Sequence, residues 1–418
     1  MYLWKVLRIL HTSDWHLGLE LGGHSRLAEQ ERFLDWLLET CKERRIDALL
    51  VCGDIFDVLH PPVEAQSLLA RFLVDFHRTL PSALAILLAG NHDSPTRLEA
   101  PAPFTDALGR IRLVGHWRSD HPSDHLIPIP GPDGLPRAIC LAVPFLRSQD
   151  LLCRTEPDQS PEEARGRAIG QVYSTLRALA TQQHPGIPVV CTGHLTLAGT
   201  QKAGSERLLI GGVESVPAST LSADTVYTAL GHIHRMQTAG SPFVRYSGSP
   251  LAMDFDETRH EHVVLSVDIP SDGPASLESV PVPEVVPLLR LGGPGSDWEN
   301  LASEVERFDW TPWRGLPRSL QPLVELSFRE DGPVVDLRER TDALLADLPL
   351  RLVGAPRIHR SVAVGEDPDR IQTDLGSQDA PLRVLETHWL RHHGAEPPAD
   401  LVACFLEAVE TVRSGGGT

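Results

Sequence analysis

Apolar and polar positions follow two different periods in the N-terminal part of the chain. Short apolar runs of strand length occur at residues 7–10, 48–51 and 84–88. Between them, apolar residues recur at helical spacing over residues 25–45 and again over residues 61–76. This order of strand, helix, strand, helix and strand predicts an α/β sheet whose ligands gather where the strands end.

After residue 110 the apolar runs become shorter and more strand-like. We expect strands at residues 111–114, 138–143, 189–191, 226–230 and 263–267. One helix is expected in this part, near residues 161–180. Together with the first part, these elements predict a layered α/β sandwich over residues 1–268, which is long enough to bury a substantial core.

The rest of the chain divides into a linker, a small module and a tail. Six prolines between residues 269 and 294 indicate a linker or an extended crossing to another module. The pattern then predicts a small α+β domain over residues 283–365, with helices at 298–308 and 337–345 and strands at 323–328 and 351–353.

Two amphipathic stretches close the chain and form a predicted helical tail over residues 378–418. Their apolar positions are Leu382, Leu385, Trp389, Leu401, Phe405 and Leu406. Because few residues remain to cover such a face, we interpret it as a docking surface for another protein. Packing of the tail on its own domain is the alternative.

Composition and charge narrow the class of protein. The chain has 38 basic and 56 acidic residues, a formal net charge of −18, which excludes a simple basic coat for nucleic acid but leaves a local basic strip or a metal site open. No apolar run approaches the roughly 20 residues that span a bilayer, so we expect no membrane association. Six scattered cysteines without a C-x-x-C pair indicate a reducing, cytoplasmic location.

Five polar clusters each follow one of the predicted strands. They are Asp14-Trp15-His16, Gly53-Asp54 with Asp57, Gly90-Asn91-His92-Asp93, Gly193-His194 and Gly231-His232-Ile233-His234. A glycine just before the polar residue allows a sharp turn at the strand end. A single cluster of this kind is weak, since a lone histidine is usually a hydrogen-bonded core residue and G-N-H-D also suits a turn. Five clusters in succession, each at a strand end, predict a shared site.

The residue types indicate a metal centre. Aspartate and histidine one residue apart reach neighbouring points from an extended backbone. Carboxylate oxygen combined with imidazole nitrogen suits manganese, iron or zinc, whereas magnesium and calcium prefer oxygen alone. Seven candidate ligands are too many for one ion, so we predict two metals. Asp54 is our choice for a carboxylate that bridges two ions roughly 3.5–4 Å apart.

These motifs, in this order, resemble the calcineurin-like metallophosphoesterases. The longer strings at residues 10–18, 88–93 and 246–250 resemble the SbcD family of nuclease subunits, as does Ser205-Glu206-Arg207 with the glycines at 211–212. The resemblance is strong over residues 7–265 and weaker beyond. It implies a four-layer α/β metallophosphoesterase sandwich, followed by a small α+β capping domain for DNA recognition and a C-terminal helical tail.

The resemblance also implies roles for individual residues. The first of two Mn²⁺ ions would be held by Asp14, His16, Asp54 and His234. The second would be held by Asp54, Asn91, His194 and His232, with Mg²⁺ as a weaker substitute at both sites. His92 would contact the scissile phosphate and assist the leaving oxygen, with Asp57 beside it. Either Asp57 or Asp93 would orient the His92 ring; capping of the following helix is the alternative for Asp93.

The implied function is a DNA nuclease of repair and recombination, a 3′–5′ exonuclease and endonuclease on duplex ends and hairpins. Its implied partner is the SbcC ATPase, in a heterotetramer of two SbcC and two SbcD subunits that pair through their nuclease domains. The protein would lie in the cytoplasm, with the nucleoid. One alternative is a phosphodiesterase or phosphatase that acts on small nucleotides or phosphoproteins, and another is a subunit that only scaffolds the ATPase. The intact ligand set argues against the scaffold, and the added module favours a polymeric substrate.

Overall fold

The computed structural model describes residues 6–131, 133–151, 160–201, 216–332 and 334–360, with a few isolated positions beyond them. The chain separates into two compact units, residues 1–360 and 361–418. The predicted tail over residues 378–418 lies outside the described residues except at positions 389, 397–398 and 401–402. Ser205-Glu206-Arg207 and the glycines at 211–212 also lie outside them.

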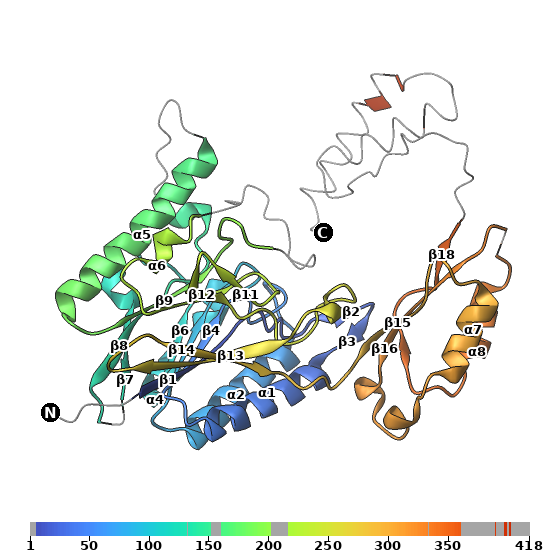
Figure 1. Cartoon of the computed structure of the whole chain (residues 1–418), viewed down its shortest axis with the longest axis horizontal. Helices are drawn as coiled ribbons and strands as arrows, with labels where there is room; N and C mark the ends of the chain where they lie inside the picture. The colour runs from blue at the N-terminus through green and yellow to red at the C-terminus, as the bar shows by residue number, and fades with distance from the viewer. Residues whose placement is uncertain are drawn as a thin grey trace. The chain divides into compact units, whose positions relative to one another are not determined.

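Two six-stranded sheets form the centre of the first unit (Figure 1). The first sheet has the order β14 (Ser276–Pro281), β13 (Val263–Pro270), β1 (Val6–Thr12), β4 (Ala48–Cys52), β5 (Leu84–Leu88) and β6 (Ile111–Val114). The second has the order β11 (Gln237–Ala239), β12 (Ser241–Tyr246), β10 (Tyr227–Gly231), β9 (Val189–His194), β8 (Pro136–Leu141) and β7 (Leu126–Pro130). Strands β1, β4, β5 and β6 are parallel to one another, as are β8, β9, β10 and β12.

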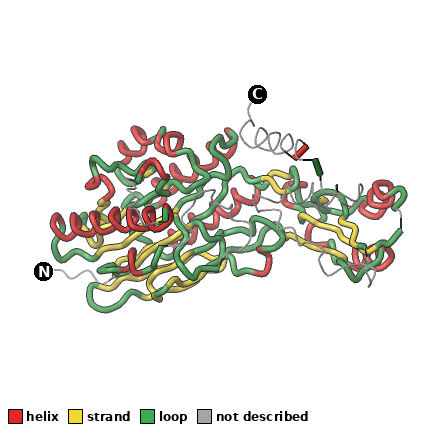
Figure 2. The backbone as a smooth tube through the Cα atoms, turned by 90° about the horizontal axis from the view of Figure 1, so that it is seen from above, coloured by secondary structure: helices red, strands yellow, loops and turns green. Residues whose placement is uncertain are grey.

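Helices cover the outer face of each sheet, so the domain has four layers. Helices α1 (Leu27–Glu43) and α2 (Val63–Thr79) lie on the first sheet, and α5 (Pro161–Gln183) lies on the second (Figures 1 and 2). Alternate residues of β1 show why: Leu10 packs among the α1 and α2 side chains, whereas Ile9 packs between the two sheets. The predicted four-layer sandwich is thus confirmed.

The other α-helices described before β13 are short. They are α3 (Pro95–Glu99), α4 (Ala102–Leu108) and α6 (Ser219–Ser222). The small hairpin of β2 (Glu20–Leu21) and β3 (His24–Ser25) follows the first polar cluster. Within the described residues, no helix is long and apolar enough to cross a membrane.

The proline-rich stretch is more ordered than a linker. Residues 276–281 form β14, which pairs antiparallel with β13 and makes one edge of the first sheet. Pro270 and Pro281 lie at the ends of these two strands. Because β14 is the edge strand, one row of its backbone groups is unpaired, so Pro281 is tolerated there, whereas Pro270 is the last residue of the interior strand β13. The interpretation as a linker or crossing is therefore wrong for the strand residues 276–281 and 288–292, while residues 282–287 do connect the first sheet to the next module.

A four-stranded parallel sheet builds the small α+β module, which we call the cap. Its elements are β15 (Leu288–Gly292), α7 (Trp298–Arg307), β16 (Leu323–Arg329), α8 (Leu337–Leu345), β17 (Arg351–Leu352) and β18 (Arg357–His359). Its core joins Leu301 and Val305 of α7 to Leu326 and Phe328 of β16. The predicted helices and strands of this part are confirmed, while β15 and β18 were not predicted.

The cap also contacts the phosphoesterase sheets through a second apolar cluster. Phe255, from the connection after β12, packs with Val286, Leu288 and Leu323 of the cap. In addition, His24 Nε2 lies 2.8 Å from the carbonyl oxygen of Leu352. These contacts place the connection between β12 and β13 against the cap, which matters for the site described next.

Candidate metal centre

All seven predicted ligands lie where the two sheets end. Asp14 and His16 follow β1, Asp54 follows β4, and Asn91 follows β5. His194 is the last residue of β9, and His232 and His234 follow β10. These strands are parallel within each sheet, so their carboxyl ends face one crevice, as the sequence pattern predicted.

The first group of side chains consists of Asp14, His16 and His234. One ligand atom from each lies within 4.8 Å of the others, and all three residues are buried. Asp54 adjoins this group, since its Oδ2 lies 3.8 Å from His16 Nε2. This is the set of four residues that the resemblance assigns to the first ion.

The second group consists of Asp54, His194 and His232, and it satisfies the same distance criterion. Asp54 Oδ2 lies 3.2 Å from His194 Nε2. The amide oxygen Oδ1 of Asn91 lies 3.0 Å from both His194 Nε2 and His232 Nδ1. Asp54 therefore lies between the two groups, which is the place that a bridging carboxylate requires.

The chemistry of the donors fits two divalent cations. His16 Nδ1 lies 3.2 Å from the Asp57 carboxylate, and His194 Nδ1 lies 2.8 Å from the carbonyl oxygen of Cys52. Because carboxylate and carbonyl oxygens only accept, both rings carry their proton on Nδ1 and turn the Nε2 lone pair toward the centre. His16 Nε2 is buried and has no hydrogen-bond partner. A buried atom of this kind calls for a partner, which a cation would provide.

The electrostatics of the centre show how closely these groups interact. Burial alone would raise the pKa of Asp54, but His194 and His16 outweigh it and hold the pKa well below its usual range. Burial would lower the pKa of His194, but the Asp54 carboxylate prevails and raises the pKa to about 9. Burial raises the pKa of Asp14. Positive charge is thus strongly favoured around Asp54.

His92 and Asp57 are neighbours, but the His92 ring contacts the main-chain oxygen of Asp57 instead of its carboxylate. His92 Nδ1 donates to the main-chain oxygen of Asp57 at 2.7 Å, while the Asp57 carboxylate lies against His16. Asp57, His16 and His92 also offer ligand atoms within 4.8 Å of one another. His92 is 9% exposed, more than any of the four histidines among the predicted ligands. It is therefore the histidine best placed to reach a substrate.

Asp93 serves neither of the two purposes considered for it. Its carboxylate accepts hydrogen bonds of 2.8–3.0 Å from the backbone N–H groups of Gly90, Ile55 and Phe56. The helix that follows, α3, has no side-chain cap. Asp93 therefore links the loop after β5 to the loop after β4 by hydrogen bonds. These bonds fix the positions of Asn91 and Asp54 relative to each other.

Four of the predicted ligands have left-handed backbone conformations. The φ angles are 54° at Asp14, 46° at His16, 48° at Asp54 and 94° at His232. Residues other than glycine rarely adopt such angles, and each costs about 1–3 kcal/mol. Hydrogen bonds support them: the N–H of Asp14 donates to Gly53 O, and that of His232 donates to Asp14 Oδ1, both at 3.0 Å. Strained backbone is thus concentrated at the centre.

The glycines before the ligands are required for different reasons. Gly53 has a φ of 90°, as the predicted sharp turn needs. Gly90 and Gly231 do not have positive φ angles. At these two positions there is no room for a Cβ atom. A Cβ at Gly90 would lie 2.1 Å from Asp54 Oδ1, and one at Gly231 would lie 1.9 Å from the carbonyl oxygen of Cys52. The predicted turn is thus replaced by close packing, between the loops after β4 and β5 of the first sheet at Gly90 and between the two sheets at Gly231.

Gly231→Ala is expected to lower the free energy of unfolding by about 1–3 kcal/mol, because overpacking a close backbone contact forces the strands apart. Urea denaturation followed by circular dichroism measures the change. Gly166→Ala is the matched control, since nothing lies within 4 Å of its Cβ and alanine favours a helix interior such as α5. Equal stability of wild type and Gly231→Ala would contradict the steric argument.

Two residues near the centre were missed by sequence reasoning. Ser13 Oγ donates to Asp14 Oδ2 at 2.6 Å, and the only signal was its place before Asp14 in the motif. Glu257 Oε1 lies 2.8 Å from His234 Nδ1. It follows the Tyr246–Pro250 string by seven residues, and no local pattern marks it as a site residue.

Comparison with known proteins agrees with this site. A family model described as calcineurin-like phosphoesterase matches residues 7–236. The chain is 38% identical to the D subunit of nuclease SbcCD from Rhodobacter capsulatus, over 83% of this chain and 86% of that protein. It is 33% identical to the protein of the same name from Escherichia coli K12, over 83% of this chain and 84% of that protein. It is 34% identical to the D subunit of nuclease SbcCD from Bacillus subtilis, over 97% of this chain and 99% of that protein.

The family model covers more than half of the chain, and the relatives are matched over most of their length. The predicted ligands at the strand ends lie within the matched residues. These ligands and matches together identify a metal-dependent phosphodiesterase. The chain belongs to the calcineurin-like phosphoesterases and, within them, to the SbcD family of nuclease subunits.

Proposed function

We propose that this protein is the nuclease component of an SbcCD-type complex and cleaves DNA with two Mn²⁺ ions, with Mg²⁺ as a weaker substitute. The single observation that carries the proposal is the position of Asp54 between two ligand groups, Asp14-His16-His234 and Asn91-His194-His232. Relatives named as the D subunit of nuclease SbcCD support DNA as the substrate.

Two divalent cations at such a centre supply positive charge to the non-bridging oxygens of a phosphodiester and lower the pKa of the attacking water. The chain's own residues prepare the rest. Asn91 places its amide oxygen 3.0 Å from His194 Nε2 and from His232 Nδ1, so the three side chains would surround the second cation. His92 donates from Nδ1 to Asp57 O, so its Nε2 is the atom that faces a leaving 3′ oxygen and gives it a proton.

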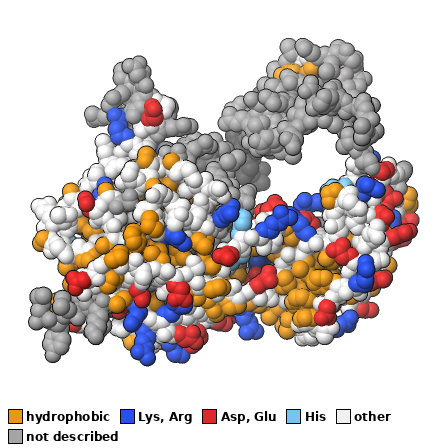
Figure 3. All heavy atoms as spheres, viewed as in Figure 1, with side chains coloured by type: hydrophobic (Ala, Val, Ile, Leu, Met, Phe, Trp, Pro, Cys, Tyr) orange, Lys and Arg blue, Asp and Glu red, His pale blue; other side chains and the backbone are white. Residues whose placement is uncertain are grey.

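The proposal includes cleavage from duplex ends and hairpins, as a 3′–5′ exonuclease and as an endonuclease, in DNA repair and recombination. It also includes an SbcC ATPase as partner, two subunits of each kind, pairing through the phosphoesterase domain and a cytoplasmic, nucleoid-associated location. Acidic, basic and apolar side chains are interspersed over the face of the cap in Figure 3. With a net charge of −18, broad electrostatic attraction is a weak source of DNA affinity, so we assign DNA recognition to the metal centre, the cap and the partner.

The test compares two substrates under the same conditions. Mn²⁺-dependent shortening of end-labelled linear duplex DNA is expected, with little turnover of cyclic nucleotides or phosphopeptides. Turnover of the small substrates without cleavage of DNA would favour the alternative phosphodiesterase or phosphatase. No hydrolysis of any substrate, with SbcC binding retained, would favour a scaffold. Loss of SbcC binding on removal of residues 378–418 tests the predicted tail.

A further inference from the structure

We propose that Glu257 is a positioning residue that fixes the imidazole of His234 for the first metal ion. The inference rests on the proposed two-metal function and deepens it. Glu257 begins the short 3₁₀ helix η3 (Glu257–Arg259) in the connection between β12 and β13. Its side chain belongs to none of the five sequence motifs, and it lies 23 residues beyond the histidine that it contacts.

The carboxylate of Glu257 is completely buried and held through both oxygens. Oε1 lies 2.8 Å from His234 Nδ1. Oε2 accepts from the backbone N–H of Met253 at 2.8 Å and from Ser249 Oγ at 3.4 Å. A buried carboxylate is costly unless hydrogen bonds compensate it, so these contacts fix its position closely. The His234 ring therefore meets an acceptor that cannot move away.

This contact decides which nitrogen of His234 faces the centre. A carboxylate accepts a hydrogen bond, so the proton resides on Nδ1 and the lone pair on Nε2. His234 contributes to the group with Asp14 and His16, in which the ligand atoms lie within 4.8 Å of one another. A carboxylate behind a histidine ligand also makes the ring more basic and a better donor to a cation.

Two other predicted ligand histidines have comparable supports, which makes the role of Glu257 testable by site. His16 is backed by the Asp57 carboxylate and His194 by the carbonyl oxygen of Cys52. The Glu257 contact is with His234 of the first ligand group, whereas His194 and His232 belong to the second. Loss of the carboxylate charge should therefore lower the affinity for the first ion and leave the affinity for the second unchanged.

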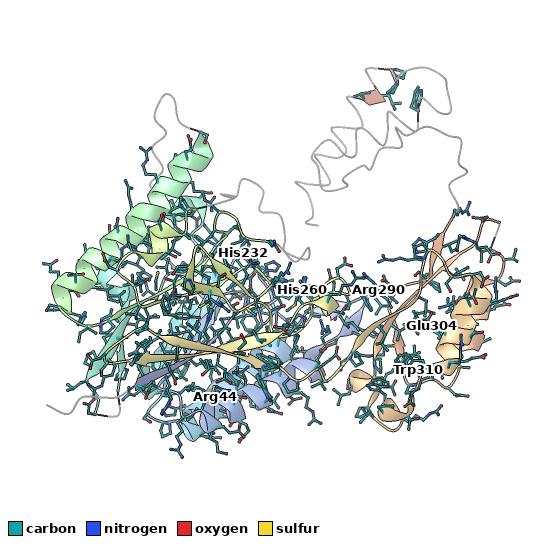
Figure 4. All side chains as sticks on the ribbon, viewed as in Figure 1. Arg44, His232, His260, Arg290, Glu304 and Trp310 are labelled. Atoms are coloured by element: carbon teal, nitrogen blue, oxygen red, sulfur yellow. The ribbon has the colours of Figure 1, made fainter. Side chains whose placement is uncertain are left out.

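The segment that carries Glu257 is anchored on its other side by the cap. Arg290 Nη1 donates to Asp256 Oδ1 at 2.6 Å, and the Arg290 guanidinium lies 5.5 Å from the centre of the Phe255 ring. Arg290 Nε also donates to Glu325 of β16 at 2.7 Å. Figure 4 shows Arg290 on the side of the cap that faces the phosphoesterase sheets. Glu257 is thus held between a metal ligand and a fixed module.

The experiment is a Mn²⁺ titration of the full-length protein by calorimetry and electron paramagnetic resonance. Wild type should bind two ions. Glu257→Gln should lower the affinity for one Mn²⁺ ion by about 10–100-fold and leave the affinity for the other unchanged. The Mn²⁺ concentration for half-maximal hydrolysis of a chromogenic phosphodiester should rise by a similar factor. Glu261→Gln, an exposed neighbour in the same connection, is the matched control and should bind both ions as wild type does.

A double-mutant cycle separates positioning from general stability. In a His234→Asn background, Glu257→Gln should add no further loss of affinity, because the ring that it positions is gone. Equal weakening of both ions, or an undiminished effect in that background, would show a merely structural role and overturn the proposal. Unchanged affinity in Glu257→Gln would overturn it as well. If wild type itself binds fewer than two ions, the proposed function fails instead.

Discussion

Asp54→Ala is expected to empty both halves of the metal centre at once. Asp54 Oδ2 lies near His194 and His16, so one carboxylate serves both ligand groups. Its removal takes a negative charge and a ligand from both groups, and buried imidazoles alone do not compensate two divalent cations. Bound Mn²⁺, measured by elemental analysis, should fall from two ions per chain to none. The rate of phosphodiester hydrolysis should fall to the rate measured without protein.

Asp75→Ala is the control for this prediction, because Asp75 is a partly exposed carboxylate on α2 and belongs to neither ligand group. It should retain both ions. Crystals of the wild type soaked in Mn²⁺ should show two anomalous peaks, each within coordination distance of Asp54. Retention of one ion by Asp54→Ala, or peaks that lie away from Asp54, would contradict the bridging role.

His92→Ala should retain both ions and lose turnover by about 10²–10⁴-fold, the usual contribution of a general acid. One contact that supports the centre is kept in this variant: the backbone N–H of residue 92 donates to Asp54 Oδ1 at 2.8 Å, and alanine retains that N–H. The lost imidazole is the group that faces the leaving oxygen. Turnover of the chromogenic phosphodiester at saturating Mn²⁺ measures the effect.

His60→Ala is a suitable comparison, since this exposed histidine lies three residues beyond Asp57. Its turnover should equal that of wild type. A substrate with a more acidic leaving group should lose less rate in His92→Ala, because it needs less help from a proton donor. Loss of an ion from His92→Ala would instead show that His92 is a ligand.

The strands and the ligand set could be predicted because their signals are local. Buried parallel strands read as short apolar runs, and β5 and β6 begin and end where the pattern placed them. The ligands directly follow such runs, so their meeting at one edge required only the general rule for parallel sheets. The metal-binding roles of the individual residues stay predictions until ions are measured.

Features that depend on contacts between distant segments were not predictable in this way. The pairing of β14 with β13 overrides the linker signal of its flanking prolines. The support of His16 by the Asp57 carboxylate and of His92 by the Asp57 carbonyl depends on how two loops meet. Gly231 is a glycine because Cys52, on the other sheet, lies against it. No pattern within a single segment reports such neighbours.

The left-handed backbone at Asp14, His16, Asp54 and His232 has a consequence for how the protein acquires metal. The hydrogen bonds that fix these conformations run between protein groups, so the fold itself imposes the ligand geometry. The conformational entropy of arranging the ligands is therefore lost when the chain folds and not when an ion arrives. Such a preorganised site binds an ion more tightly than the same ligands on a flexible chain would, because no ordering of the backbone is left to be done at binding.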